Sequence, residues 1–342
     1  MLKQTRFVAA LAAVLIAGEP VWAKMLLING AGATFPYPIY SKWFSEYAKK
    51  DGSVNFNYQS IGSGGGVRQI QAGTVDFGAT DAPMTDDEMQ RAQGGKVLHI
   101  PSVMGGVVPV YNLPGSPKLK FTQAALAGIF LGRVKNWNDT AITKENPGVS
   151  LPGDPIVVVH RSDGSGTTDC FTDFLAKASL EWKGRVGTGK SVNWPAGLGG
   201  KGNEGVAGLV KQTPNSIGYV ELGYATNNKL PFGSVQNREG NFVECSAQTV
   251  PSAAASMLGK MPKDFRISIT NAPGADSYPI STFTWLLIYQ KQTDRTKGEA
   301  VLNFLKWMLS EGQSYAEPLG YAPLPSDMIP LEEEAIAKIE LP

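Results

Sequence analysis

The segment that sets the architecture reads Ile156-Val157-Val158-Val159-His160-Arg161-Ser162-Asp163-Gly164-Ser165-Gly166-Thr167-Thr168. Its first four residues are a continuous apolar run, which predicts a strand buried on both faces. Apolar side chains then recur at helical spacing from Phe171 to Trp182, which predicts a helix directly after the turn. A strand, a tight turn and a helix in this order are the building unit of an α/β fold.

The turn itself has the chemistry of an anion site. Ser165, Gly166 and Thr167 are expected at the helix N-terminus, where backbone N–H groups lack helical partners and the helix dipole favours negative charge. Arg161 adds a planar fork of donors, and Asp163 is near enough in sequence to hold that fork in place. The sequence therefore predicts that an oxyanion binds here.

Two earlier turns have a similar composition. Thr34, between Ala33 and Phe35, comes just before Pro36, which suits the first turn of a helix. Ser63 lies in a glycine-rich turn between an alternating strand and another helical pattern. Taken alone, the Thr34 turn is a weak signal, since many such loops only cap a helix, and a plain N-cap is the better explanation of Ser63 without the other turns.

Asp81 follows the predicted strand 75–79, at the carboxyl end where α/β sheets bind ligands. Its alternative role is to cap the next helix. Thr85 and Glu88 already form a capping box for that helix, which makes the alternative weaker. The acidic run Asp86-Asp87-Glu88 is interpreted as an exposed first helical turn, stabilised by the helix dipole.

The rest of the chain alternates strand and helix patterns, which predicts an α/β protein with mainly parallel sheets. Two short strands are expected at 97–100 and 107–111, separated by the flexible pair Gly105-Gly106. A helix is expected to open at Thr122, and 231–243 resembles a hairpin. The glycine-rich segment 197–205 has no convincing strand before it, so it is interpreted as a structural loop and not a dinucleotide fingerprint.

The length of 342 residues is typical of about two domains. Lys3 and Arg6, an apolar run and the small residues Val21 and Ala23 predict a signal peptide over residues 1–23. The mature chain, starting at Lys24, is then exported and soluble. Losing this leader removes two cations and one anion, so the formal net charge falls from +1 to 0. A neutral protein has no basic field for nucleic acid, so its anion recognition must be local.

The chain has two cysteines, Cys170 and Cys245. Export permits a disulfide between them. The spacing of Cys170 from Phe174 points it toward the core, and two separate buried thiols are slightly favoured.

Four motifs around the predicted turns follow one another along the chain: Gly30-Ala31-Gly32-Ala33-Thr34-Phe35-Pro36, Ile61-Gly62-Ser63-Gly64-Gly65-Gly66, Val75-Asp76-Phe77-Gly78-Ala79-Thr80-Asp81-Ala82-Pro83 and Asp163-Gly164-Ser165-Gly166-Thr167. Together they resemble the periplasmic phosphate-binding proteins of bacterial phosphate-specific ABC transporters. Each motif alone is unspecific, whereas the ordered set is highly specific. Trp194-Pro195 and the segments 197–202, 217–221 and 278–282 fit the same family, so the resemblance covers nearly all of the mature chain.

The resemblance implies a two-domain periplasmic binding protein of the α/β class, type II-like, in which each domain is a mainly parallel sheet flanked by helices. The first domain would comprise residues 24–106 plus 281–342, and the second 107–280. A ligand cleft would lie between them, with hinge crossings near Gly105-Gly106 and Ile280-Ser281. Closure of the hinge would bring two half-sites together.

The resemblance also implies high-affinity binding of inorganic phosphate in the periplasm and its delivery to the permease subunits of an ABC importer, which work with a cytoplasmic ATPase. Such a protein is a monomer and not an enzyme, and it requires no cofactor, metal or nucleic acid. Asp163 would support Arg161. The implied phosphate ligands are Ala33, Thr34, Phe35, Ser63, Asp81, Arg161, Ser165, Gly166 and Thr167.

Two alternatives remain at this point. A receptor for another tetrahedral oxyanion such as sulfate is disfavoured by Asp81, because an ionised carboxylate accepts hydrogen bonds and sulfate has no proton to donate. A phosphate-ester hydrolase that uses Ser165 or Ser63 needs a base, and only His99 and His160 exist. The sequence shows no cluster of metal ligands for a two-metal phosphatase.

Overall fold

The computed structural model describes residues 25–342, so the predicted signal peptide over residues 1–23 lies outside the described residues. The main sheet has eight strands in the order β2-β1-β3-β11-β4-β8-β6-β7, and β10-β9-β5 form a smaller sheet. The outer strands of the main sheet pair in parallel, whereas β11 pairs antiparallel with β3 and β4, and β4 pairs antiparallel with β8. The predicted parallel pairing therefore holds toward the two edges, and the centre is antiparallel.

The strands are β1 Leu26–Gly32, β2 Val54–Ser60, β3 Phe77–Thr80, β4 Val97–Tyr111, β5 Lys120–Phe121, β6 Val157–Arg161, β7 Leu198–Gly200, β8 Ser216–Glu221, β9 Ser234–Gln236, β10 Phe242–Val243 and β11 Ser281–Tyr289. The α-helices are α1 Tyr37–Lys50, α2 Ser63–Gln71, α3 Asp86–Gln90, α4 Gln123–Phe130, α5 Thr140–Thr143, α6 Gly166–Ala178, α7 Leu180–Arg185, α8 Gly202–Gln212, α9 Leu222–Asn228, α10 Thr249–Ala255, α11 Arg295–Leu309 and α12 Ile329–Ile336. Short 3₁₀ turns occupy Leu258–Lys260, Glu311–Tyr315, Glu317–Leu319 and Ser326–Met328.

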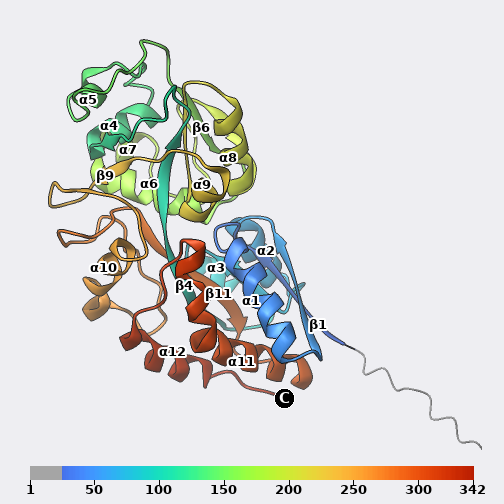
Figure 1. The fold of residues 1–342 in the computed structure, drawn as a ribbon. Helices are drawn as coiled ribbons and strands as arrows, with labels where there is room; N and C mark the ends of the chain where they lie inside the picture. The colour runs from blue at the N-terminus through green and yellow to red at the C-terminus, as the bar shows by residue number, and fades with distance from the viewer. Residues whose placement is uncertain (1–24) are drawn as a thin grey trace, which may run out of the picture.

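The helices gather at the two ends of the long strand β4 (Figure 1). We call β1–β3 with α1–α3, α11 and α12 the first lobe, and β6–β8 with α4–α9 the second lobe. Helix α10 lies beside β4 and β11. Among residues 25–342, none of the helices combines the length and apolar character that a bilayer crossing requires.

Strand β4 is continuous over 15 residues, so the prediction of two short strands broken at Gly105-Gly106 was wrong. It pairs with β11 as far as Gly106, opposite Ser281, and then with β8 from Val107 onward. The two glycines make room for neighbours and do not break the strand. A methyl group on Gly105 would lie 2.6 Å from the ring of Phe35, and one on Gly106 would lie 2.2 Å from Cys245 Sγ.

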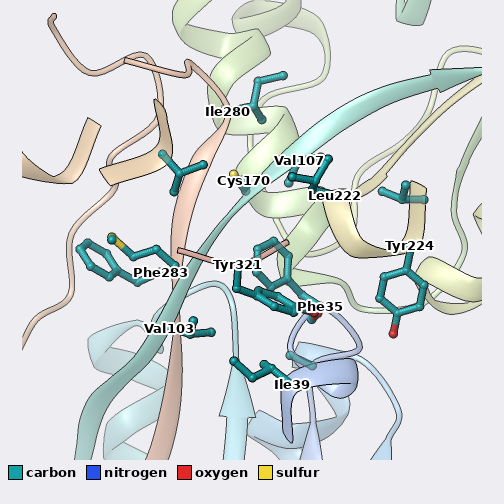
Figure 2. Packing of buried hydrophobic residues seen from close by; sticks show 14 of the residues in the cluster. Phe35, Ile39, Val103, Val107, Cys170, Leu222, Tyr224, Ile280, Phe283 and Tyr321 are labelled. Atoms are coloured by element: carbon teal, nitrogen blue, oxygen red, sulfur yellow. The ribbon is translucent and has the colours of Figure 1, made fainter. Parts of the chain in front are cut away.

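The hydrophobic core continues from one lobe to the other beside these crossing strands (Figure 2). Phe35 and Tyr321 are fully buried there, with ring centroids 6.1 Å apart. The Tyr321 hydroxyl also donates a 2.6 Å hydrogen bond to the backbone carbonyl of Phe35. The turn that carries Phe35 is therefore fixed by both apolar packing and a hydrogen bond.

Several local predictions are confirmed and two need correction. Thr122 caps α4, and β9 and β10 form the expected antiparallel hairpin. The helix expected to run on to Trp182 instead breaks at Ser179, whose side chain caps the separate helix α7. No strand precedes the glycine-rich segment 197–205, as expected, but the segment is not all loop: it contains the three-residue strand β7, which pairs in parallel with β6, and the first turn of α8.

Cys170 and Cys245 are free and buried, which confirms the expectation of two separate thiols. Cys170 Sγ lies 3.8 Å from the carbonyl oxygen of Ser281, the β-ladder partner of Gly106. Burial raises the pKa of both thiols well above the ordinary value.

Candidate functional site

The turn between β6 and α6 has the predicted form. Ser165 is the N-cap of α6, and its Oγ accepts a 3.0 Å hydrogen bond from the N–H of Thr168. Gly166 and Thr167 begin the helix, so their N–H groups lie among those that an α-helix leaves without a helical partner. Ser165 and Thr167 are fully buried. The turn therefore presents an electropositive helix end in a place away from solvent.

Arg161 is held in a bidentate pair by Asp163. Its Nε and Nη2 donate to the two carboxylate oxygens at 2.7 and 2.6 Å, and Asp163 also accepts a 3.0 Å bond from the N–H of Gly202. Burial by itself raises the pKa of Asp163, but hydrogen bonds and the charge of Arg161 outweigh it, so the pKa lies below its ordinary value. Asp163 is thus ionised at neutral pH and orients the guanidinium.

On the first lobe, Thr34 and Phe35 follow β1 and are almost completely buried. The Thr34 carbonyl accepts a 2.6 Å bond from the Tyr224 hydroxyl of the second lobe. Ala33 donates its N–H to Ala79 O at 3.0 Å, and its carbonyl accepts the Tyr58 hydroxyl at 2.8 Å. Both backbone groups of Ala33 are therefore engaged within the protein.

Ser63 and Asp81 meet beside this turn. Ser63 is the first residue of α2, after the N-cap Gly62, and its Oγ accepts the N–H of Asp81 at 3.1 Å. Asp81 Oδ1 accepts a 2.8 Å bond from the Thr284 hydroxyl, and Oδ2 lies 3.3 Å from Ser63 Oγ. Asp81 is only 3% exposed, and this burial raises its pKa to about 7. A carboxyl group that titrates near neutral pH thus lies within the cluster.

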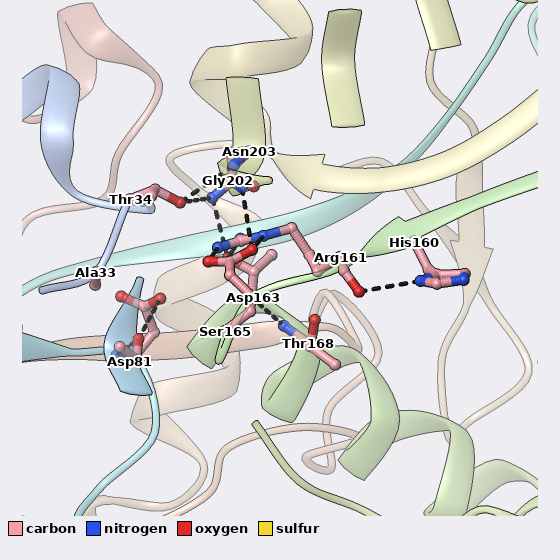
Figure 3. Close-up of polar contacts among 12 residues, drawn as sticks. Ala33, Thr34, Asp81, His160, Arg161, Asp163, Ser165, Thr168, Gly202 and Asn203 are labelled. Carbon is pink, nitrogen blue, oxygen red and sulfur yellow. Dashed lines mark hydrogen bonds and ion pairs between the residues drawn. The ribbon is translucent and has the colours of Figure 1, made fainter. Parts of the chain in front are cut away.

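The predicted residues of both lobes come together in one place (Figure 3). The N–H of Gly64 in the first lobe donates to Gly164 O in the second at 2.8 Å. A methyl group on Gly166 would lie 2.5 Å from Ser63 Oγ and 2.6 Å from Asp81 Cβ. The spacing leaves no room for a larger residue at this contact. The residues gathered here are Ala33, Thr34, Phe35, Ser63, Asp81, Arg161, Asp163, Ser165, Gly166 and Thr167.

Two residues that the sequence reasoning missed belong to the same cluster. Asn203, at the start of α8, donates from Nδ2 to Thr34 Oγ1 at 2.8 Å and to Thr167 Oγ1 at 3.1 Å. The only available signal was an amide within the glycine-rich segment 197–205, which the sequence analysis interpreted as a structural loop. Thr284 lies in the middle of β11, and nothing in the sequence distinguishes it from other strand residues.

The acidic run forms the first turn of α3 with Asp86 and Asp87 exposed, as predicted, and Glu88 is partly buried. The capping box of Thr85 and Glu88 is present as predicted. Glu88 in addition accepts Lys190 Nζ of the second lobe at 2.9 and 3.0 Å, and Asp86 pairs with Arg266 at 2.8 Å. The Lys190 carbonyl in turn accepts the N–H of Ser165 at 2.8 Å. The run therefore makes contacts beyond its own helix.

Both histidines are engaged elsewhere. His99 Nε2 accepts the N–H of Met84 at 3.0 Å, and burial lowers the pKa of His99 to about 3. His160 Nδ1 lies 3.0 Å from the carbonyl of Arg161, and its ring stacks on Trp194. Within residues 25–342, no hydrogen bond joins either histidine to a serine of the cluster, and no group of three His, Cys, Asp or Glu is arranged to hold a metal.

Comparison with known sequences places this chain in a protein family. The family model described as "PBP superfamily domain" matches residues 17–312. The phosphate-binding protein PstS of Xylella fastidiosa (strain Temecula1) is 47% identical over 310 residues, covering 90% of this chain and 84% of the relative. PstS of Pasteurella multocida is 46% identical over 323 residues, covering 94% and 93%. PstS of Haemophilus influenzae is 47% identical over 320 residues, covering 92% and 94%.

Solved structures support the fold. A high-affinity periplasmic phosphate-binding protein (PfluDING) bound with phosphate has a TM-score of 0.74 at 23% identity, covering 91% of this chain and 93% of that one. A phosphate-binding protein from Stenotrophomonas maltophilia has a TM-score of 0.69 at 20% identity with the same coverage. The chain is an α/β periplasmic binding protein in fold, and by sequence it belongs to the PstS family of phosphate-binding proteins within the PBP superfamily.

Proposed function

We propose that the protein binds inorganic phosphate with high affinity in the periplasm and delivers it to the permease of an ABC importer, without chemical change. The family assignment supports this function, because the relatives are named phosphate-binding proteins. The proposed ligands are the cluster residues of the two lobes, Thr34, Phe35, Ser63, Asp81, Arg161, Ser165, Gly166 and Thr167, with Ala33 adjacent to them and its own backbone groups bonded within the protein. Asp163 supports Arg161 and does not itself contact phosphate.

The observation that carries the choice of phosphate is the position of Asp81. A carboxylate beside a bound anion is repulsive unless the anion donates a proton to it. Phosphate near neutral pH retains at least one O–H, whereas sulfate has none, and an ionised carboxylate can only accept. With Asp81 ionised, above its pKa of about 7, the site would thus reject sulfate through charge repulsion and an unmade hydrogen bond.

The two proposed domains are residues 24–106 plus 281–342 and residues 107–280, joined near Gly105-Gly106 and Ile280-Ser281. Contacts between the lobes support closure around the ligand, since Gly64 bonds Gly164 and Glu88 bonds Lys190. The proposed partners are the permease subunits of a phosphate ABC transporter, working with its cytoplasmic ATPase, and the protein acts as a monomer.

Calorimetric titration of the mature, ligand-stripped protein with phosphate and then with sulfate tests this function. We expect phosphate to bind more tightly by roughly 10⁴–10⁵-fold, the discrimination typical of a site built around one ligand hydrogen bond. Asp81→Asn keeps the shape of the side chain, removes its charge and adds a hydrogen-bond donor. It should therefore reduce the difference in affinity between phosphate and sulfate.

Asp169→Asn is the control, because it removes another carboxyl group with a raised pKa, partly buried in the first turn of α6, that is outside the proposed ligand set. It should leave the preference for phosphate in place. Equal affinity of the wild type for both anions would refute the phosphate assignment. If Asp81→Asn keeps a strong preference for phosphate over sulfate, Asp81 is not the residue that discriminates between them. The assignment of phosphate as the ligand would still hold.

A further inference from the structure

We propose that Asn203 is a positioning residue that makes the hydroxyls of Thr34 and Thr167 obligate donors to the bound anion; this rests on the proposed function. Asn203 is fully buried, and its side chain reaches both hydroxyls (Figure 3). Thr34 belongs to the first lobe and Thr167 to the second. One amide thus acts on both halves of the site.

A backbone hydrogen bond to its oxygen fixes the orientation of the Asn203 amide. The backbone N–H of Glu221, at the end of β8, donates to Asn203 Oδ1 at 3.0 Å. An N–H can only donate, so the atom facing Glu221 has to be the amide oxygen. The amide nitrogen, which can only donate, is therefore the atom that faces the two threonines.

Each threonine hydroxyl has two acceptor sites and one proton to donate. Thr34 Oγ1 accepts from Asn203 Nδ2 at 2.8 Å and from the backbone N–H of Asn203 at 3.2 Å. Both of its acceptor sites are filled, so its proton is left to point toward another acceptor. The only role that remains for this hydroxyl toward a ligand is to donate.

Thr167 is arranged in the same way. Its Oγ1 accepts from Asn203 Nδ2 at 3.1 Å and from Arg161 Nη1 at 3.3 Å. Neither hydroxyl can take a proton from the anion, so the oxygens of phosphate that face them are unprotonated. The protonated oxygen is directed to Asp81, and Asn203 therefore determines how a partly protonated anion is oriented in the site.

The test measures phosphate affinity by calorimetry for Asn203→Ala and Asn203→Asp. Asn203→Ala frees one acceptor site on each hydroxyl, since the backbone N–H of residue 203 and Arg161 keep the others, and it should weaken binding by roughly ten- to a hundredfold, the loss expected for two hydrogen bonds. Asn203→Asp keeps the acceptor for Glu221 but replaces the donor by an acceptor, which draws both hydroxyl protons away from the ligand. It should weaken binding further.

Asn146→Ala is the matched control for loss of a buried amide. Asn146 also uses both ends of its side chain, accepting from Lys120 N–H at 2.8 Å and donating to Ile142 O at 2.8 Å, but it lies outside the cluster. Its replacement should lower the thermal midpoint of the ligand-free protein and leave phosphate affinity unchanged. If Asn203→Ala fails to fold, Asn203→Ser supplies the same comparison.

A mutant cycle separates the positioning role from a merely structural one. With both threonines replaced by valine, Asn203→Ala should change phosphate affinity by less than about twofold, because the hydroxyls through which it acts are gone. An equal loss in both backgrounds would overturn the inference, as would unchanged affinity of Asn203→Ala in the wild-type background. If the wild type itself fails to bind phosphate, the proposed function fails instead, and the two failures are thereby distinguished.

Discussion

Thr284 Oγ1, in the middle of β11, donates a 2.8 Å hydrogen bond to Asp81 Oδ1, just past the end of the neighbouring strand β3. The carboxyl group thus has a hydroxyl partner, and the hydrogen bond lowers its pKa only in part. Burial is the larger effect and raises the pKa to about 7. Asp81 is therefore a group whose ionisation costs folding free energy at neutral pH.

This relationship predicts how Asp81→Asn changes the stability of the ligand-free protein. The folded-state pKa of about 7 exceeds the ordinary value of 3.8, so the folded protein binds the proton more tightly than the unfolded chain does. The stabilising effect of that proton is complete below about pH 4 and is lost as the pH rises through 7. Relative to wild type, Asp81→Asn should gain roughly 2–3 kcal/mol of unfolding free energy between pH 5 and pH 8.

Urea unfolding of both proteins at the two pH values gives this difference. Asp169 and Glu221, with pKa values raised by burial to about 6 and about 8, titrate in both proteins, and the charge of Asp81 interacts with both, so the measured difference includes this coupling as well as the titration of Asp81 itself. A difference between wild type and variant that is the same at pH 5 and pH 8 would contradict a raised pKa for Asp81.

Arg161→Ala should weaken phosphate binding by roughly 2–5 kcal/mol, the cost of breaking a buried charge pair, because it also leaves Asp163 unpaired. Arg133→Ala is the control, since Arg133 pairs with Glu181 on the exposed surface. Isothermal titration measures both variants. A loss below about 0.5 kcal/mol for Arg161→Ala, the size of an ordinary surface substitution, would place Arg161 outside the binding site.

Phosphate should make the protein more compact, as seen in the radius of gyration from small-angle scattering, because the proposed ligands come from both lobes. Gly166→Ala should abolish this compaction, since its methyl group would overlap Ser63 and Asp81 of the opposite lobe. Gly208→Ala is the control, as a methyl group there meets no atom within 4 Å. An unchanged radius in the wild type, with binding confirmed in the same sample, would argue against closure.

The purified protein should not hydrolyse phosphate esters, because His99 and His160 are hydrogen-bonded away from Ser63 and Ser165. Release of p-nitrophenol from p-nitrophenyl phosphate provides the assay. Turnover that stays with the protein through purification and disappears in Ser165→Ala would show that the serine is a nucleophile after all.

Features set by neighbouring residues were predictable from the sequence. Ser165 caps a helix that begins at the next residue, and Arg161 pairs with a carboxylate two positions away. The capping box of Thr85 and Glu88 spans a single helical turn. In each case the chemistry and the spacing are both local, so the pattern indicates the contact directly.

Contacts between distant segments were not predictable in this way. Asn203 meets Thr34 across 169 residues, and Thr284 meets Asp81 across 203. Such pairs depend on strand order, which the apolar pattern alone does not specify. The prediction that the strand breaks at Gly105-Gly106 was wrong for a related reason. The pair was interpreted as flexible, but the space is needed for Phe35 and Cys245, which come from elsewhere in the chain.

One buried thiol packs against each of the two strands, β4 and β11, that join the lobes. Cys245 Sγ lies against Gly106, and Cys170 Sγ lies near the carbonyl of its ladder partner Ser281. Burial keeps both sulfurs protonated and out of reach of a maleimide until this packing loosens. The rate at which Cys170 and Cys245 are alkylated therefore reports how often the packing around β4 and β11 opens. Mass spectrometry can measure this rate on the native protein, without an introduced dye.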